Sequence, residues 1–89
     1  MNNRAGTVSR TLRKAGHTVI FRQDRKREGV FVTNGPFGMV TIHFDLDSES
    51  LRLEHIAAIL PTVMDLGIPI KLRATEDDAF IHLYFEEDK

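Results

Sequence analysis

The order of apolar and polar residues along the chain follows two periods, one typical of helices and one typical of strands. In the first segment, apolar residues recur at helical spacing and basic residues fall on the opposite side. The apolar residues are Ala5, Val8, Leu12 and Ala15, and the basic residues are Arg10, Arg13 and Lys14. This pattern predicts a helix over residues 4–15, followed by Gly16 as a left-handed stop.

Three short runs rich in β-branched and aromatic residues follow, and each is typical of a strand. They cover residues 18–21, 30–33 and 40–44. The third run alternates most regularly, with Ile42 and Phe44 facing one way and His43 the other. Between the second and third runs, Asn34 and Gly35 favour the start of a tight hairpin.

A second helix is predicted between residues 48 and 67, where Ser48 or Ser50 can cap the start and Gly67 can end it. The expected apolar stripe consists of Leu53, Ile56, Ala57, Leu60, Val63 and Met64. Pro61 lies inside this stripe and removes one backbone donor. Because the apolar pattern keeps its phase across Pro61, we expect a kink and not a break.

The last two apolar runs, residues 70–73 and 80–85, predict two further strands, with Ile81, Leu83 and Phe85 facing the core. The element order is then α-β-β-β-α-β-β. It predicts an α+β fold, a two-layer sandwich with helices on one face of a mainly antiparallel sheet. Residues 1–89 should form a single domain, with residues 85–89 as a frayed acidic tail.

Composition bears on the expected cellular location of the chain and on the kinds of site it can contain. The sequence contains no cysteine, which excludes disulfides and thiolate zinc sites. No apolar run approaches the ~18–20 residues of a membrane span, and none resembles the apolar core of a signal peptide. We therefore expect a cytoplasmic protein with no membrane partner.

Charge is distributed unevenly along the chain. Residues 1–27 carry eight of the twelve lysines and arginines and one acidic residue, Asp24, whereas residues 28–89 carry the other twelve acidic residues. The two parts have formal net charges of +7 and −8, although the whole chain has −1. This asymmetry indicates a surface that attracts nucleic acid or an acidic partner, or two parts that lie against each other or against a second copy.

The basic residues define the first candidate binding surface. Several lie in residues 22–29, RQDRKREG, a stretch that we interpret first as a hairpin tip and second as a grip for phosphates. The candidate contacts for a partner protein or nucleic acid are Arg10, Arg13, Lys14, Arg22, Arg25, Lys26 and Arg27.

The second candidate surface lies on the last strand, opposite its core-facing residues. It consists of Phe80, His82 and Tyr84. Such a stripe on an open sheet can stack nucleobases, but burial under the first helix or against a second copy is the favoured interpretation.

The chain offers little catalytic chemistry. The residues Gly35–Gly38 lack the lysine and helix of a phosphate-binding loop. None of the histidines forms a close ligand pair on one helix; they are His17, His43, His55 and His82. His43 and His82 face outward and are expected as surface residues, although they could be neighbours on the sheet. We therefore predict that the protein is not an enzyme and has no cofactor or metal.

Two family resemblances bear on function. The opening residues 7–16, TVSRTLRKAG, resemble the start of small, uncharacterised accessory proteins of actinobacterial phages, which implies a host-interaction role in the host cytoplasm. Residues 12–17, LRKAGH, and 40–42, VTI, are similar to HicA-type toxins, which have a double-stranded-RNA-binding-like α-β-β-β-α core. That family has a catalytic histidine on its second strand, but residues 27–32 contain none, so the resemblance does not extend to nuclease activity.

Three hypotheses follow from the sequence. The first is a non-enzymatic binding module, a phage accessory protein that engages a host macromolecule, with a protein favoured over nucleic acid. The second is a nucleic-acid-binding domain of the double-stranded-RNA-binding type. The third is a self-associating module, such as a homodimer formed through a sheet edge or through Phe80, His82 and Tyr84.

Overall fold

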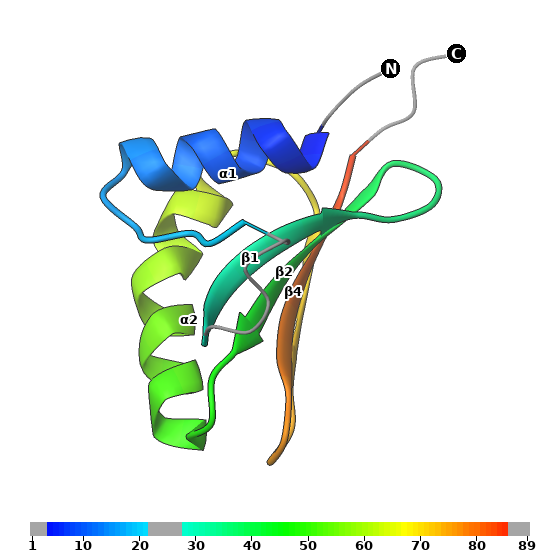
Figure 1. Cartoon of the computed structure of the whole chain (residues 1–89). Coiled ribbons are helices and arrows are strands. Elements are labelled where there is room, and N and C mark those ends of the chain that lie inside the picture. The colour runs from blue at the N-terminus through cyan, green and yellow to red at the C-terminus, as the bar shows by residue number, and fades with distance from the viewer. Residues whose placement is uncertain (1–3, 22–27, 86–89) are drawn as a thin grey trace.

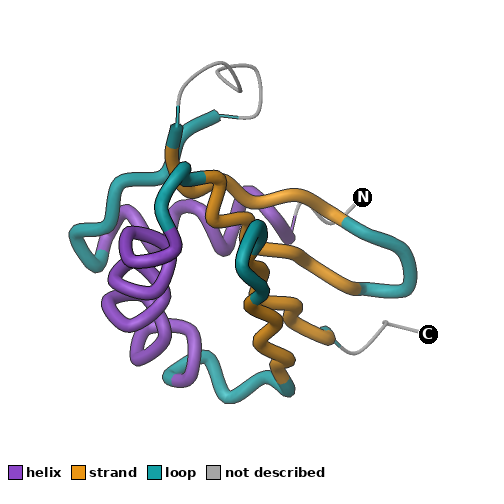
Figure 2. Tube along the Cα trace, turned by 90° about the horizontal axis from the view of Figure 1, so that it is seen from below, coloured by secondary structure: helices purple, strands orange, loops and turns teal. Residues whose placement is uncertain are grey.

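The chain folds into two helices packed against one four-stranded sheet, as the computed structural model shows for residues 4–21 and 28–85. In chain order the elements are α1 (Arg4–Lys14), β1 (Gly29–Asn34), β2 (Met39–Asp45), α2 (Glu49–Met64), β3 (Ile70–Ala74) and β4 (Ala79–Tyr84). The strands lie in the order β1-β2-β4-β3, and each neighbouring pair is antiparallel. Both helices lie on the same face of the sheet (Figures 1 and 2), which confirms the α+β class.

The element order contains one strand fewer than the sequence pattern predicts. The segment 18–21 runs alongside the start of β1 but makes only one backbone bond to it in the described residues, from the Ile20 amide to the Val30 carbonyl at 2.8 Å. Val19 is buried in the core, whereas the side chain of Phe21 is exposed. The apolar, β-branched composition that suggested a strand therefore reflects packing beneath α1 and not a hydrogen-bonded ladder.

The core lies between the helices and the inward face of the central strands. The register pairs Val40 with Leu83 and Ile42 with Ile81, and each of these side chains is at most 1% exposed. The expected inward direction of these residues is confirmed. Burial at about 1.5–3 kcal/mol per side chain makes this cluster the main source of stability.

Helix α1 begins and ends as its sequence predicts, but its first turn is capped by a distant residue. The amide of Ala5 donates to Asn34 Oδ1 on β1 at 3.0 Å. Val8 and Leu12 are buried, and Gly16 has a φ of 96°, the left-handed geometry that ends the helix. The cap ties the start of α1 to the end of β1.

Helix α2 continues through Pro61, as expected, but it buries a different face. Ser48 caps the start, and the buried residues are Arg52, Ile56, Ile59 and Val63. Leu53 and Met64, expected in the core, are 50% and 62% exposed. The helix is apolar around much of its circumference, so the period alone did not select the buried face.

The hairpin between β1 and β2 turns later than the Asn34–Gly35 pair suggests. The positive φ angles fall on Phe37 (57°) and Gly38 (77°), and the Met39 amide bonds the Pro36 carbonyl at 3.1 Å. Two consecutive positive φ angles are typical of a type I′ turn. The turn presents Phe37 at the tip with its side chain 84% exposed.

Candidate functional site

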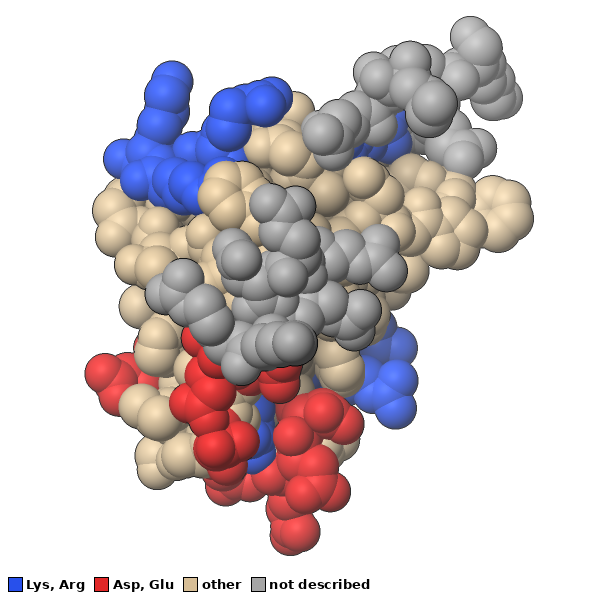
Figure 3. Space-filling model, viewed as in Figure 1, with Lys and Arg blue, Asp and Glu red and all other residues tan. Residues whose placement is uncertain are grey.

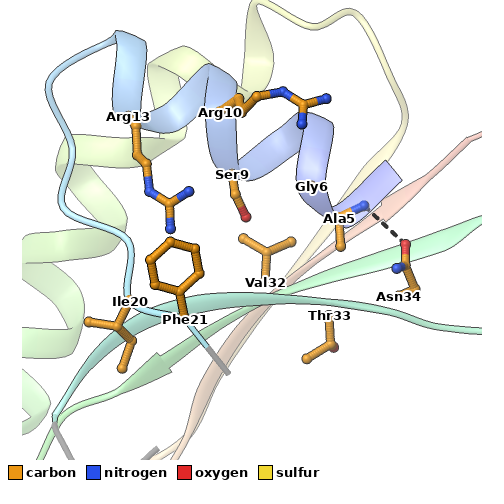
Figure 4. Close-up of a pocket in the computed structure, with 10 residues that line it drawn as sticks. All are labelled: Ala5, Gly6, Ser9, Arg10, Arg13, Ile20, Phe21, Val32, Thr33 and Asn34. Carbon is orange, nitrogen blue, oxygen red and sulfur yellow. Dashed lines mark hydrogen bonds between the residues drawn. The ribbon is translucent and has the colours of Figure 1, made fainter. Parts of the chain in front are cut away.

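An open groove of about 390 Å³ lies between α1 and the outer edge of β1 (Figure 4). It is lined by Ala5, Gly6, Ser9, Arg10, Arg13, Ile20, Phe21, Val32, Thr33 and Asn34. The bond between Ala5 and Asn34 closes one end. The groove therefore combines backbone of an edge strand, apolar side chains and cationic side chains of α1.

Arg13 closes the other end of the groove and is held in place by two contacts. Its Nη2 donates to the Val19 carbonyl at 2.9 Å, and its guanidinium lies 4.4 Å from the centroid of the Phe21 ring. These contacts fix the segment 18–21 below α1. Arg13 therefore has mainly a structural role, although its positive charge also lies in the groove lining.

Arg10 and Lys14 are the freer cations of α1. Both are exposed, and Arg10 Nη2 donates to Thr7 Oγ1 through a long bond of 3.3 Å. The structure therefore brings together the predicted residues Arg10, Arg13 and Lys14 on one helix. The other predicted residues, Arg22, Arg25, Lys26 and Arg27, lie outside the described residues.

Carboxylates gather at the opposite end of the domain from the cations of α1 (Figure 3). The topology explains this, because β1 and β4 begin there while β2 and β3 end there. The acidic residues at these element ends are Glu28, Asp45, Asp47, Glu49, Glu76, Asp77 and Asp78. A hydrogen bond and electrostatic repulsion from Asp47 raise the pKa of the Glu28 carboxyl above its ordinary value of 4.5.

Arg52 is buried beside this acidic end, at 4% exposure. Its Nη1 donates to the Leu46 carbonyl at 2.5 Å and its Nη2 donates to the Glu76 carbonyl, while its Nε has no hydrogen-bond partner. One guanidinium therefore joins α2, the loop after β2 and the turn between β3 and β4.

The second predicted surface lies on the face of the sheet that carries no helix. Phe80 and His82 are half-buried and Tyr84 is 42% exposed, so α1 does not cover them. The register adds Phe31 and His43 to the same face. Their positions were not assigned to this surface from the sequence, although Phe31 alternates with inward-facing Val30 and Val32.

The rings on this face pack against one another. Phe31 and His43 stack with centroids 4.5 Å apart, His43 meets Phe80 edge-on at 5.4 Å, and Phe80 lies roughly parallel to His82 at 6.1 Å. Because the rings use their faces on each other, few are left for a nucleobase to stack on. This geometry favours a protein contact over base stacking.

His43 and His82 lie on this same face of the sheet, but each is hydrogen-bonded to a different threonine. His43 Nε2 lies 2.8 Å from Thr33 Oγ1, and His82 Nδ1 lies 3.0 Å from Thr41 Oγ1. Burial, together with the positive charges of Arg73 and Lys71, lowers the pKa of His82 below its ordinary 6.5.

The other two histidines also have structural partners. His17 pairs with Thr62 at 3.2 Å, and His55 pairs with the Leu51 carbonyl at 2.8 Å. Across residues 4–21 and 28–85, no group of three or more histidines and acidic residues is placed to hold a metal ion. In the same residues, neither helix is long and apolar enough to cross a membrane.

Sequence reasoning found the cations of the groove but missed its other half. Ser9, Val32 and Thr33 carry no distinctive signal, and they become groove residues only because β1 lies at the sheet edge beneath α1. No protein-family model, curated protein or solved structure matches this chain.

Proposed function

We propose that the protein is a small non-enzymatic binding module that engages an acidic site on a partner protein through α1 and the adjoining groove. The observation that carries the proposal is the separation of charge. Helix α1 contains four basic residues and no acidic one, and it borders the groove, whereas carboxylates gather at the far end. The resemblance to phage accessory proteins would make this partner a host protein.

The groove favours a protein over a nucleic acid as the partner. Ile20, Phe21 and Val32 give it apolar walls, and a phosphate backbone offers no apolar groups to pair with them. Arg10 is an exposed cation in its lining, and Lys14 is a second exposed cation one turn further along α1. Mixed apolar and cationic lining suits a peptide that carries both apolar and acidic side chains.

The test compares two double charge reversals that change the net charge equally. Arg10→Glu with Lys14→Glu alters α1, and Lys71→Glu with Arg73→Glu alters the exposed cations of β3. Each immobilised protein is exposed to host lysate, with and without nuclease, and the retained proteins are identified by mass spectrometry. An acidic protein retained by the wild type and the β3 variant, and lost from the α1 variant, is the expected result.

Two outcomes would overturn this proposal. Equal retention by both variants would remove α1 as the contact surface. Retention that disappears after nuclease treatment would favour the nucleic-acid-binding alternative, whose affinity should also fall steeply with added salt.

Self-association is a second candidate, favoured by the ring-bearing face of the sheet, which neither helix covers. We expect Tyr84 and the half-buried Phe80 to lie at the centre of such a homodimer contact. Light scattering on the wild type and on Tyr84→Arg tests it. A wild-type protein that stays monomeric at high concentration would refute this candidate.

A further inference from the structure

We infer that the groove binds an extended acidic segment of the partner as an additional strand on the outer edge of β1, beside Val32. This inference rests on the proposed function and specifies how the partner is held. Three features of the described residues carry it: the direction of the backbone groups of β1, the shape of the groove and the position of its cations.

The backbone of β1 has hydrogen-bonding groups that face away from the sheet. β1 is the end strand in the order β1-β2-β4-β3, and alternate residues of an antiparallel strand direct their amide and carbonyl groups to opposite sides. The Val30 carbonyl accepts from the Ile20 amide, which lies outside the sheet. The backbone amide and carbonyl of Val32, two residues further on, therefore also point away from β2. Val32 therefore presents an amide and a carbonyl to the groove.

The segment 18–21 covers only the beginning of this edge. Its bond to β1 is at Val30, and on β1 the groove is lined by Val32, Thr33 and Asn34. These residues cover about 10 Å at roughly 3.3 Å per residue, which accommodates about three residues of an extended chain. On the helix side, the small residues Gly6 and Ser9 line the groove and leave room for the added backbone.

The cations select acidic side chains on the added strand. Side chains of an extended segment alternate in direction, so every second residue would point toward α1. Arg10 lies above the groove on that side, and Arg13 lies at its end (Figure 4). The groove therefore suits a segment with carboxylates at alternate positions, held by main-chain bonds to Val32 and by charge pairing with Arg10.

The test uses capped synthetic heptapeptides as probes. The parent peptide is Glu-Val-Glu-Val-Glu-Val-Glu, and the charge control replaces each glutamate with lysine. Two further versions carry N-methyl groups on the glutamates alone or on the internal valines alone. In an extended chain the amides of alternate residues face opposite sides, so only one of these versions loses the donors that face β1.

Binding is measured by titration of the full chain, followed by backbone amide NMR and amide hydrogen exchange. The parent peptide should shift the amides of β1 and slow exchange at Val32. One N-methylated version should bind about tenfold more weakly, since it loses its hydrogen bond to the Val32 carbonyl and places a methyl group against β1, while the other should bind as the parent does. The lysine peptide and the Arg10→Glu variant should show little binding.

The outcomes separate this inference from the proposed function. If both N-methylated peptides bind as tightly as the parent while Arg10→Glu abolishes binding, strand addition is wrong and an acidic contact at α1 still stands. If the parent peptide shifts no amide of α1 or β1 at about 1 mM, the weak end of measurable affinity, strand addition is also overturned. In that case the capture experiment with the α1 and β3 variants decides the proposed function independently.

Discussion

Replacing Arg52 with methionine is expected to lower the free energy of unfolding by about 2–3 kcal/mol. The side chain is 4% exposed and donates to the carbonyls of Leu46 and Glu76. Methionine retains an unbranched apolar stem that fills similar space, but it cannot donate to either carbonyl. The substitution therefore isolates the hydrogen bonds of the guanidinium from its packing.

The magnitude follows from two opposing contributions. Two hydrogen bonds from a charged donor contribute about 1.5–3 kcal/mol each, which gives a gross loss of about 3–6 kcal/mol. Removing the guanidinium also ends the burial of an Nε without a partner, which recovers about 1–3 kcal/mol. For a domain of this size, the remaining 2–3 kcal/mol corresponds to a fall in melting temperature of about 10–20 °C.

Urea unfolding and thermal melts followed by circular dichroism would measure this effect. Arg73→Met serves as the matched control, because Arg73 is exposed on β3 and its replacement should change stability by less than about 0.5 kcal/mol. Arg52→Lys should give an intermediate loss, since an ammonium lacks the two-pronged geometry that reaches both carbonyls. Equal stability of Arg52→Met and Arg73→Met would refute this account of Arg52.

Three further predictions concern single substitutions at other positions. Asn34→Ala should lower stability by about 1 kcal/mol, because the cap on the Ala5 amide is lost, and an unchanged melting temperature would contradict this. Phe37→Asn should raise stability by about 0.5–1 kcal/mol, because asparagine tolerates a positive φ better than phenylalanine; a lower melting temperature would show otherwise. The lowered pKa of His82 means that the folded state favours the neutral imidazole. The stability that depends on neutral His82 is therefore fully present above pH 6.5 and is lost as the pH falls below 6.5. In His82→Asn, which can keep a bond to Thr41, the melting temperature should fall less than in the wild type as the pH is lowered from 7. The same pH dependence in both proteins would exclude this role of His82.

The sequence predicted the elements whose local signals and burial agree. The sequence of β2 alternates between apolar and polar residues from Val40 to Phe44, and Ile42 and Phe44 are buried as expected. Helix α1 has an apolar stripe, basic residues in its last turn and a terminal glycine, and its observed bounds follow these signals. Here local propensity and tertiary packing favour the same structure.

The predictions that the structure contradicts concern segments whose local composition is compatible with more than one arrangement. The segment 18–21 has strand composition, but it packs under α1 and bonds β1 once. In α2, apolar residues surround much of the helix, and the sheet selected the side that includes Arg52. A buried arginine could not be anticipated, because its acceptors are carbonyls from Leu46 and from the distant Glu76.

The candidate groove shows the same division. The sequence by itself determined that basic residues concentrate in the first segment and on one side of a helix, because helical spacing fixes which side chains share a face. Only the tertiary structure decided that this helix lies beside an edge strand, with Val32 directing its backbone outward and Asn34 capping the helix. Strand order and cross-strand register arise from contacts between residues distant in the chain, and no local pattern specifies them.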